Sequence, residues 1–124
     1  MTTTHSSAGW WSLTAAWAVL IAIGALIPIP SAASQQVGWL DKPIHLCEYL
    51  VFAWCLVRAG DASMYPHATT FAIALLASTT WGFLLEGLQM WLPYRSAEWA
   101  DVAANLIGSI AGSALGAWWM GRTS

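Results

Sequence analysis

The chain has 124 residues, of which 58% are hydrophobic and only 8% are charged. Soluble domains carry roughly 25% charged residues, so this composition lacks the polar side chains that a water-facing surface needs. The formal net charge of -2, with no basic cluster or glycine-rich phosphate loop in the sequence, argues against nucleic-acid binding. We therefore expect one integral membrane domain over residues 1–124, with the lipid bilayer as its partner.

The first predicted membrane span covers residues 10–29, which contain no charged residue. At 1.5 Å per residue, a helix of this length crosses a hydrocarbon core of about 30 Å. Pro28 and Pro30 end the run, because the residue before a proline disfavours the helical conformation. A cleaved signal peptide is the alternative interpretation, but the segment before the run has no Lys or Arg, and the run is longer than a typical signal-peptide core.

Three more spans are predicted at residues 43–59, 68–92 and 99–120. Pro43 suits the first turn of a helix, Ala59-Gly60-Asp61 and Pro66 predict a loop, and Pro93 ends the third span. Most tryptophans fall near the predicted span ends, as in the aromatic belts of membrane proteins. The sequence therefore predicts an all-α fold, an integral membrane four-helix bundle with both termini on one side of the bilayer.

The positive residues divide evenly between the two sides of this bundle. Arg58 and Arg122 lie on the side of the termini, whereas Lys42 and Arg95 lie on the other side. We expect Lys42 and Arg95 to be held by acidic partners, so the remaining bias of positive charge puts the termini in the cytoplasm.

Polar side chains gather at the span ends that face away from the termini. Lys42, His45 and Tyr49 are spaced i, i+3, i+7 and share one face of a helix. Topology alone brings them to the same end as the polar residues that close the third span and open the fourth. The predicted ligand-binding cluster consists of Asp41, Lys42, His45, Tyr49, Glu86, Gln89, Arg95, Asp101 and Asn105.

Glu86 is the most informative member, because it lies inside the predicted interface. An ionised carboxylate there costs several kcal/mol unless it is paired, hydrated or protonated. Lys42, His45 and Arg95 are the available partners.

His45, Glu86 and Asp101 are also candidate catalytic residues for acid–base chemistry, although no positioned nucleophile accompanies them. The alternative for the polar set is that it only hydrogen-bonds across helices and fixes their packing. We expect neither a metal nor a cofactor, since the sequence has no zinc-binding motif of the HExxH or CxxC type.

The fourth span carries Gly108, Gly112 and Gly116, spaced by four residues. Small residues at this spacing let helices approach closely in lipid, so we interpret these glycines as helix-packing positions. Asp101 and Asn105 lie on the same stripe at 100° per residue. The stripe is therefore predicted to face the bundle interior and to carry both polar residues inward.

Two segments resemble the VanZ-like family of membrane proteins. The first is DKPIHLCEY, with Asp41, Lys42, His45 and Tyr49, and the second is EGLQMWLPYRSAEWADVAANLIG, which runs from Glu86 through Gln89, Arg95, Asp101 and Asn105 to Gly108. Glu48 departs from the pattern, because the family has an apolar residue there. The resemblance implies a multi-pass protein of the bacterial plasma membrane, related to a protein linked to low-level teicoplanin resistance, but it implies no reaction.

Three functions are compatible with these features. The first is a cell-envelope protein that binds a polar headgroup or a lipid-linked cell-wall precursor at the polar cluster, and thereby affects susceptibility to glycopeptides such as teicoplanin. The second is an intramembrane enzyme that acts by acid–base chemistry on a lipid-linked substrate. The third is a proton or small-solute pathway. The sequence leaves the oligomeric state open.

Overall fold

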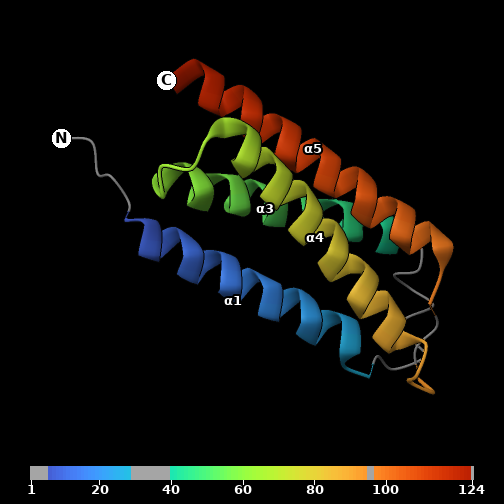
Figure 1. Cartoon of the computed structure of the whole chain (residues 1–124). Helices are drawn as coiled ribbons and strands as arrows, with labels where there is room; N and C mark the ends of the chain where they lie inside the picture. Colours follow the sequence, from blue (N-terminus) through green and yellow to red (C-terminus); the bar gives the residue numbers. More distant parts are fainter. Residues whose placement is uncertain (1–5, 29–39, 95–96, 124) are drawn as a thin grey trace.

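The computed structural model describes residues 6–28, 40–94 and 97–123. Within these ranges the chain forms four α-helices and no β-strand: α1 (Ser7–Leu26), α3 (Asp41–Ala62), α4 (His67–Gln89) and α5 (Trp99–Thr123). The helices alternate in direction, so the start of α1 and the end of α5 lie at one end of the bundle (Figure 1). The predicted all-α fold with four helices is confirmed.

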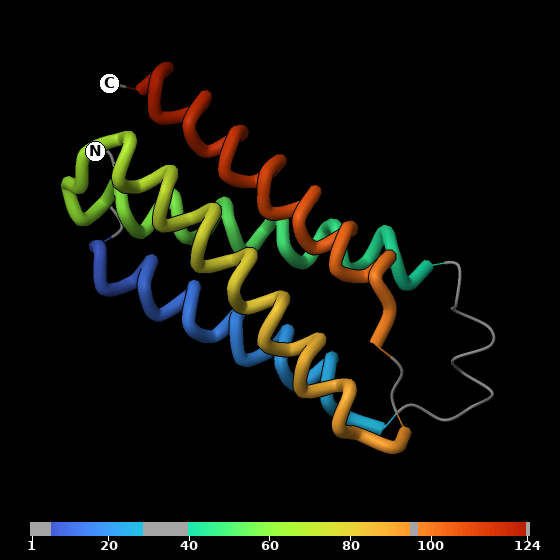
Figure 2. Tube along the Cα trace, turned by 45° about the vertical axis from the view of Figure 1, so that its right-hand side comes forward, coloured from blue at the N-terminus to red at the C-terminus, as the bar shows by residue number. Residues whose placement is uncertain are grey.

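The pair α3–α5 makes the most extensive helix contact in the bundle. Helix α4 packs on both members of this pair, and α1 packs on α3 and α4. Figure 2 shows α4 in front of α3, with α1 and α5 on opposite sides. The core therefore lies around α3, which contacts all three other helices.

The observed helix ends differ from the predicted span ends where local chemistry intervenes. Helix α1 ends at Leu26, because Ile27, which precedes Pro28, takes an extended backbone with ψ 147°. Helix α3 begins at Asp41 and therefore includes Pro43 in its first turn, where no intrahelical acceptor exists for the missing N–H. Asp41 and Lys42 are thus part of the helix.

The predicted loop at residues 59–61 is wrong, because α3 continues to Ala62. Gly60 is helical and buried, and a Cβ built on it would lie 2.8 Å from Thr70 Cγ2 of α4. The glycine is needed for this close approach rather than for a turn. At the other end of α4, the helix stops at Gln89, before Pro93, and the chain continues in a turn in which the Trp91 N–H donates to the Leu88 carbonyl.

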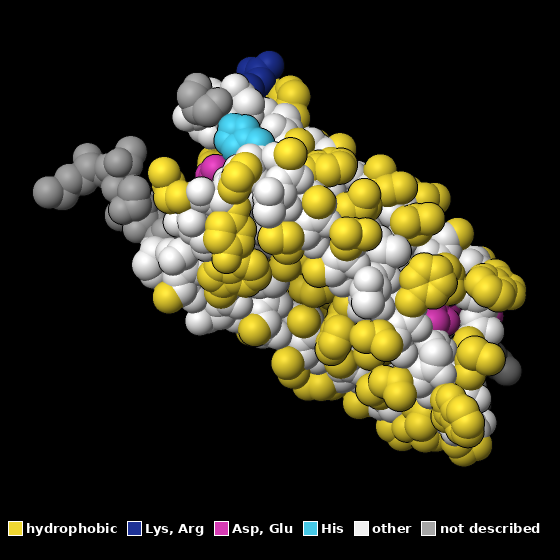
Figure 3. Space-filling view, viewed as in Figure 1, with side chains coloured by type: hydrophobic (Ala, Val, Ile, Leu, Met, Phe, Trp, Pro, Cys, Tyr) yellow, Lys and Arg dark blue, Asp and Glu magenta, His cyan; other side chains and the backbone are white. Residues whose placement is uncertain are grey.

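Helices α1, α4 and α5 are long and apolar enough to cross a membrane. Among the described helices, α3 does not reach the same apolarity, since it carries charged residues at both ends. The outer surface remains hydrophobic nonetheless, with Leu20 58%, Leu76 66% and Leu84 56% exposed. On the face drawn in Figure 3, hydrophobic side chains predominate between the two ends, and the charged side chains lie at the ends.

The glycines of α5 pack directly against α3. A Cβ on Gly108 would overlap the Leu46 carbonyl oxygen, and one on Gly116 would lie 2.6 Å from Val57 Cγ1. All three glycines of the stripe are buried, Gly112 included. The absence of a side chain therefore sets the short distance between α3 and α5, and with it the relative position of the polar residues that the two helices carry.

Candidate functional site

Lys42 is the centre of an ion-pair network that joins α3 to the start of α5. Its Nζ lies 2.5 Å from Asp101 Oδ1, 2.6 Å from Glu98 Oε2 and 3.2 Å from Asp41 Oδ2. Desolvation opposes the charge on Lys42, but the hydrogen bonds to these carboxylates outweigh it and raise the pKa of the ammonium. Because the Asp101 side chain is only 7% exposed, its pair with Lys42 is the most protected bond of the network.

His45 lies one turn further along α3, between two of the same carboxylates. Its Nε2 is 3.3 Å from Asp41 Oδ1 and 3.9 Å from Asp101 Oδ2, and its Nδ1 is 3.8 Å from Glu48 Oε2. Asp41 is close enough to orient the imidazole, which is the part a carboxylate plays beside a histidine in general acid–base chemistry.

Three donor groups of this network have the spacing of a metal site. One ligand atom each from Asp41, His45 and Asp101 lies within 4.8 Å of the others. The Lys42 ammonium contacts both aspartates, however, and already supplies the positive charge that a metal ion would bring. These residues could hold a cation only if Lys42 moved away.

Glu86 of α4 is buried beside this network without joining it. Its residue is 6% exposed, and the backbone N–H of Glu98 donates to its carboxylate. Its Oε2 has no hydrogen-bond partner, and no described residue forms an ion pair with it. Lys42 and His45, two of the available partners, do not pair with Glu86, because Asp41 and Asp101 contact both side chains. Arg95, the third available partner, lies outside the described residues.

The remaining predicted cluster residues divide between two places. Tyr49 and Asn105 are buried one turn below the ion pairs, where both approach Gly82 of α4. Gln89 turns away from the network, because its Nε2 donates to the Ala25 carbonyl of α1 at 2.8 Å. The structure thus brings Asp41, Lys42, His45 and Asp101 into direct contact and uses Gln89 to attach α1.

The predicted cluster lacks two features of the structure, which are Glu98 and a buried polar seam. Behind Asp101 and Asn105, α5 carries Ser109 and Ser113, which are fully buried, and α4 carries Ser78 on its inner face. The signal was the four-residue spacing of small polar residues from Asp101 onward. The close α3–α5 approach accounts for the small size of these side chains.

A groove of about 250 Å³ opens beside Glu86, between the end of α4 and the start of α5. Its lining combines the carboxylates Glu86 and Glu98 with the apolar side chains Phe83, Met90 and Trp99. In Figure 3, acidic surface appears among hydrophobic side chains at this end of the bundle. The groove therefore connects the polar network with the hydrophobic outer surface.

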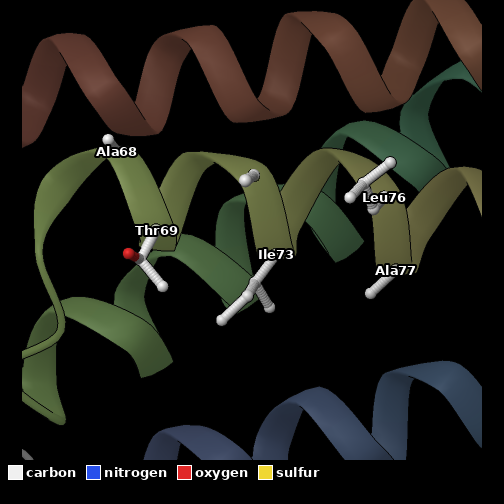
Figure 4. A pocket seen from close by; sticks show the side chains of 6 residues that line it. Ala68, Thr69, Ile73, Leu76 and Ala77 are labelled. Carbon is white, nitrogen blue, oxygen red and sulfur yellow. The ribbon is translucent and has the colours of Figure 1, made fainter.

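A larger hollow of about 580 Å³ lies elsewhere on α4 and lacks such chemistry. Figure 4 shows that the labelled side chains all come from one helix, α4, and that the polar one is Thr69. A shallow apolar surface of this kind fits lipid chains rather than a specific ligand.

The opposite end of the bundle holds a different cationic group. The Arg58 guanidinium lies 3.7 Å from the Trp119 ring centroid and 4.6 Å from that of Trp10. The two indoles come from α5 and α1, so the stacked arginine joins three helices by cation–π interactions. The flanking tryptophans thus cover the faces of the Arg58 guanidinium.

Comparison of the chain with models of protein families, with curated proteins and with solved structures finds no match.

Proposed function

We propose that this chain is a VanZ-like protein of the bacterial plasma membrane that binds a polar headgroup, or a lipid-linked cell-wall precursor, at its polar cluster. The observation that carries the proposal is the convergence of Lys42, His45, Glu86 and Asp101 from three helices beside a groove open to the hydrophobic surface. The four helices would cross the bilayer with their termini in the cytoplasm, which puts the cluster at the outer leaflet.

Packing alone is a poor explanation for this cluster. Buried ion pairs are often no more stabilising than well-packed hydrophobic residues of similar volume, because desolvation offsets their attraction. Ionisable groups within membrane segments are costly and generally mark a functional site. A cell-envelope protein that binds precursor headgroups here would alter their access to glycopeptides such as teicoplanin.

The test is binding of a fluorescently labelled lipid-linked cell-wall precursor to the purified full chain in mild detergent. Glu86→Gln and Arg95→Ala should each weaken binding, because each removes an ionisable group of the predicted polar cluster. Arg122→Ala is the matched control, since Arg122 lies at the end of α5 and stacks on Trp118. Failure of the wild-type chain to bind, or equal binding by wild type and both site variants, would refute the proposal.

His45 supports a second candidate function, an intramembrane enzyme acting on a lipid-linked substrate. The observation that favours it is the position of His45 Nε2 between Asp41 and Asp101. An enzyme of this kind would convert the lipid chemically, and His45→Asn would abolish conversion while leaving lipid binding intact. Turnover that survives His45→Asn would rule out this role for His45.

A further inference from the structure

We infer that the groove between α4 and α5 takes the ammonium headgroup of an amphiphile, with Glu86 pairing with the ammonium. The inference rests on the proposed function, since it specifies which headgroup the polar cluster binds. Glu86 differs in its contacts from three other acidic residues nearby. Asp41, Glu98 and Asp101 all contact Lys42, whereas Glu86 contacts no cation within the described chain.

The Glu86 side chain is placed to receive a ligand from outside. It lines the groove, the residue is only 6% exposed, and its Oε2 is without a hydrogen-bond partner in the described structure. A buried carboxylate oxygen in this state loses its hydration without compensation. An N–H donor that enters the groove can supply the hydrogen bond that Glu86 Oε2 lacks.

The sign of the local charge selects a cationic donor. All acidic residues of the chain except Asp61 lie at this end of the bundle, and Lys42 is the cation that the described residues set against them. The field that the described residues set up at the groove is therefore negative, which favours a positive headgroup and disfavours a phosphate placed against Glu86. An ammonium also supplies the N–H donors that a charge-assisted bond to Glu86 requires.

The walls of the groove select an amphiphile over a free ion. Phe83, Met90, Trp99 and Val102 surround the carboxylates with apolar surface, and Met90 and Trp99 are 75% and 83% exposed. A hydrated metal ion gains nothing from such walls, whereas an acyl chain can lie along them while its headgroup reaches Glu86. Aminophospholipids with a primary ammonium have this combination.

Gly87 provides a way to close the groove without touching its charges. It lines the groove, and a Cβ built on it meets no atom within 4 Å. Gly87→Leu should therefore fold normally and fill the space in front of Glu86. Gly121→Leu is the matched control, because a Cβ at Gly121 also meets nothing within 4 Å and the residue lies at the other end of α5.

The experiment measures binding of short-chain phosphatidylethanolamine, phosphatidylcholine and phosphatidylglycerol with identical acyl chains to the full chain in mild detergent. Native mass spectrometry gives the dissociation constants, and methylamine tests the ammonium without a chain. Phosphatidylethanolamine should bind about tenfold more tightly than the other two lipids, as one charge-assisted hydrogen bond predicts. Glu86→Gln should abolish that preference, and Gly87→Leu should weaken phosphatidylethanolamine binding by about tenfold. Asp61→Asn and Gly121→Leu should change neither value, and circular dichroism checks that each variant is folded.

Equal binding of the three lipids, or a preference that survives Glu86→Gln, would overturn the inference. Methylamine binding as tight as that of phosphatidylethanolamine would also overturn it, because the groove walls would then contribute nothing. Preferential binding of phosphatidylglycerol that is lost in Arg95→Ala would refute the ammonium while leaving the proposed function intact. Absence of binding by all three lipids and by the labelled cell-wall precursor would remove both.

Discussion

Replacement of Gly112 by alanine tests whether the glycine stripe sets the distance between α3 and α5. A Cβ at Gly112 would overlap the Leu50 carbonyl oxygen and lie 2.9 Å from Ala53 Cβ. Carbon atoms in favourable contact are about 3.5 Å apart, so the two helices must separate by roughly 0.6 Å or more. Separation along this interface also lengthens the bonds from Lys42 to the acidic residues of α5.

The expected cost can be isolated by comparison with an unobstructed glycine. Overpacking costs about 1–3 kcal/mol, whereas the change from glycine to alanine in a helix recovers up to about 1 kcal/mol. Gly121→Ala has the second effect without the first, because nothing lies within 4 Å of its new Cβ. The free energies of unfolding of the two variants should therefore differ by about 1–3 kcal/mol, with Gly112→Ala the less stable.

The assay is thermal unfolding in mild detergent followed by circular dichroism, with wild type, Gly112→Ala and Gly121→Ala measured under identical conditions. Headgroup binding measured on the same samples should weaken in Gly112→Ala only, since the interface positions the polar cluster. Equal stability of the two variants would contradict the close packing of α3 on α5. A stability loss without any loss of binding would contradict the coupling between the interface and the site.

Three further perturbations probe individual contacts. Lys42 has a raised pKa in the folded chain, so its contribution to stability is fully present below the ordinary lysine pKa of about 10.4 and is lost as the pH rises through the folded value. Wild type should therefore lose more thermal stability than Lys42→Arg between about pH 9 and pH 12, because arginine stays protonated. An equal loss of melting temperature in the two proteins would count against the ion-pair network. Arg58→Leu should lower the free energy of unfolding by about 1–2 kcal/mol, as loss of a partly desolvated cation–π contact predicts. Arg122→Leu should lower it by less, since Arg122 stacks on one indole in the described structure. A larger effect of Arg122→Leu in chemical unfolding would contradict the greater weight given to the Arg58 contacts. Gln89→Leu removes the hydrogen bond to the Ala25 carbonyl and should speed hydrogen exchange in the second half of α1, at a cost of about 1 kcal/mol; unchanged exchange there would show that α1 is held by other contacts.

Composition and proline placement determined the helical class and the number of helices. Too few charged residues are present for a water-facing surface, and an apolar run such as residues 10–26 has one stable conformation in an apolar solvent, the helix. The four-residue glycine spacing likewise indicated close packing, because only a residue without a Cβ permits it. These features depend on local sequence, so they can be predicted without the tertiary structure.

The helix ends were harder to predict, because they depend on what packs against them. Gly60 has the local character of a turn residue, yet it lies within α3 because Thr70 of α4 occupies the space of its missing Cβ. Helix propensity is weak compared with tertiary packing, so a prediction from local sequence placed the end of α3 too early.

The pairing within the polar cluster was decided by tertiary structure alone. Periodicity put Lys42, His45, Glu86 and Asp101 at one end of the bundle, but any of the cations could have paired with any of the acids. The close contact of α3 with α5 brings Lys42 to Asp101 and leaves Glu86 of α4 facing a groove. Sequence determines that these charges need partners, since an isolated charge is costly in lipid, whereas helix packing determines which of them pair.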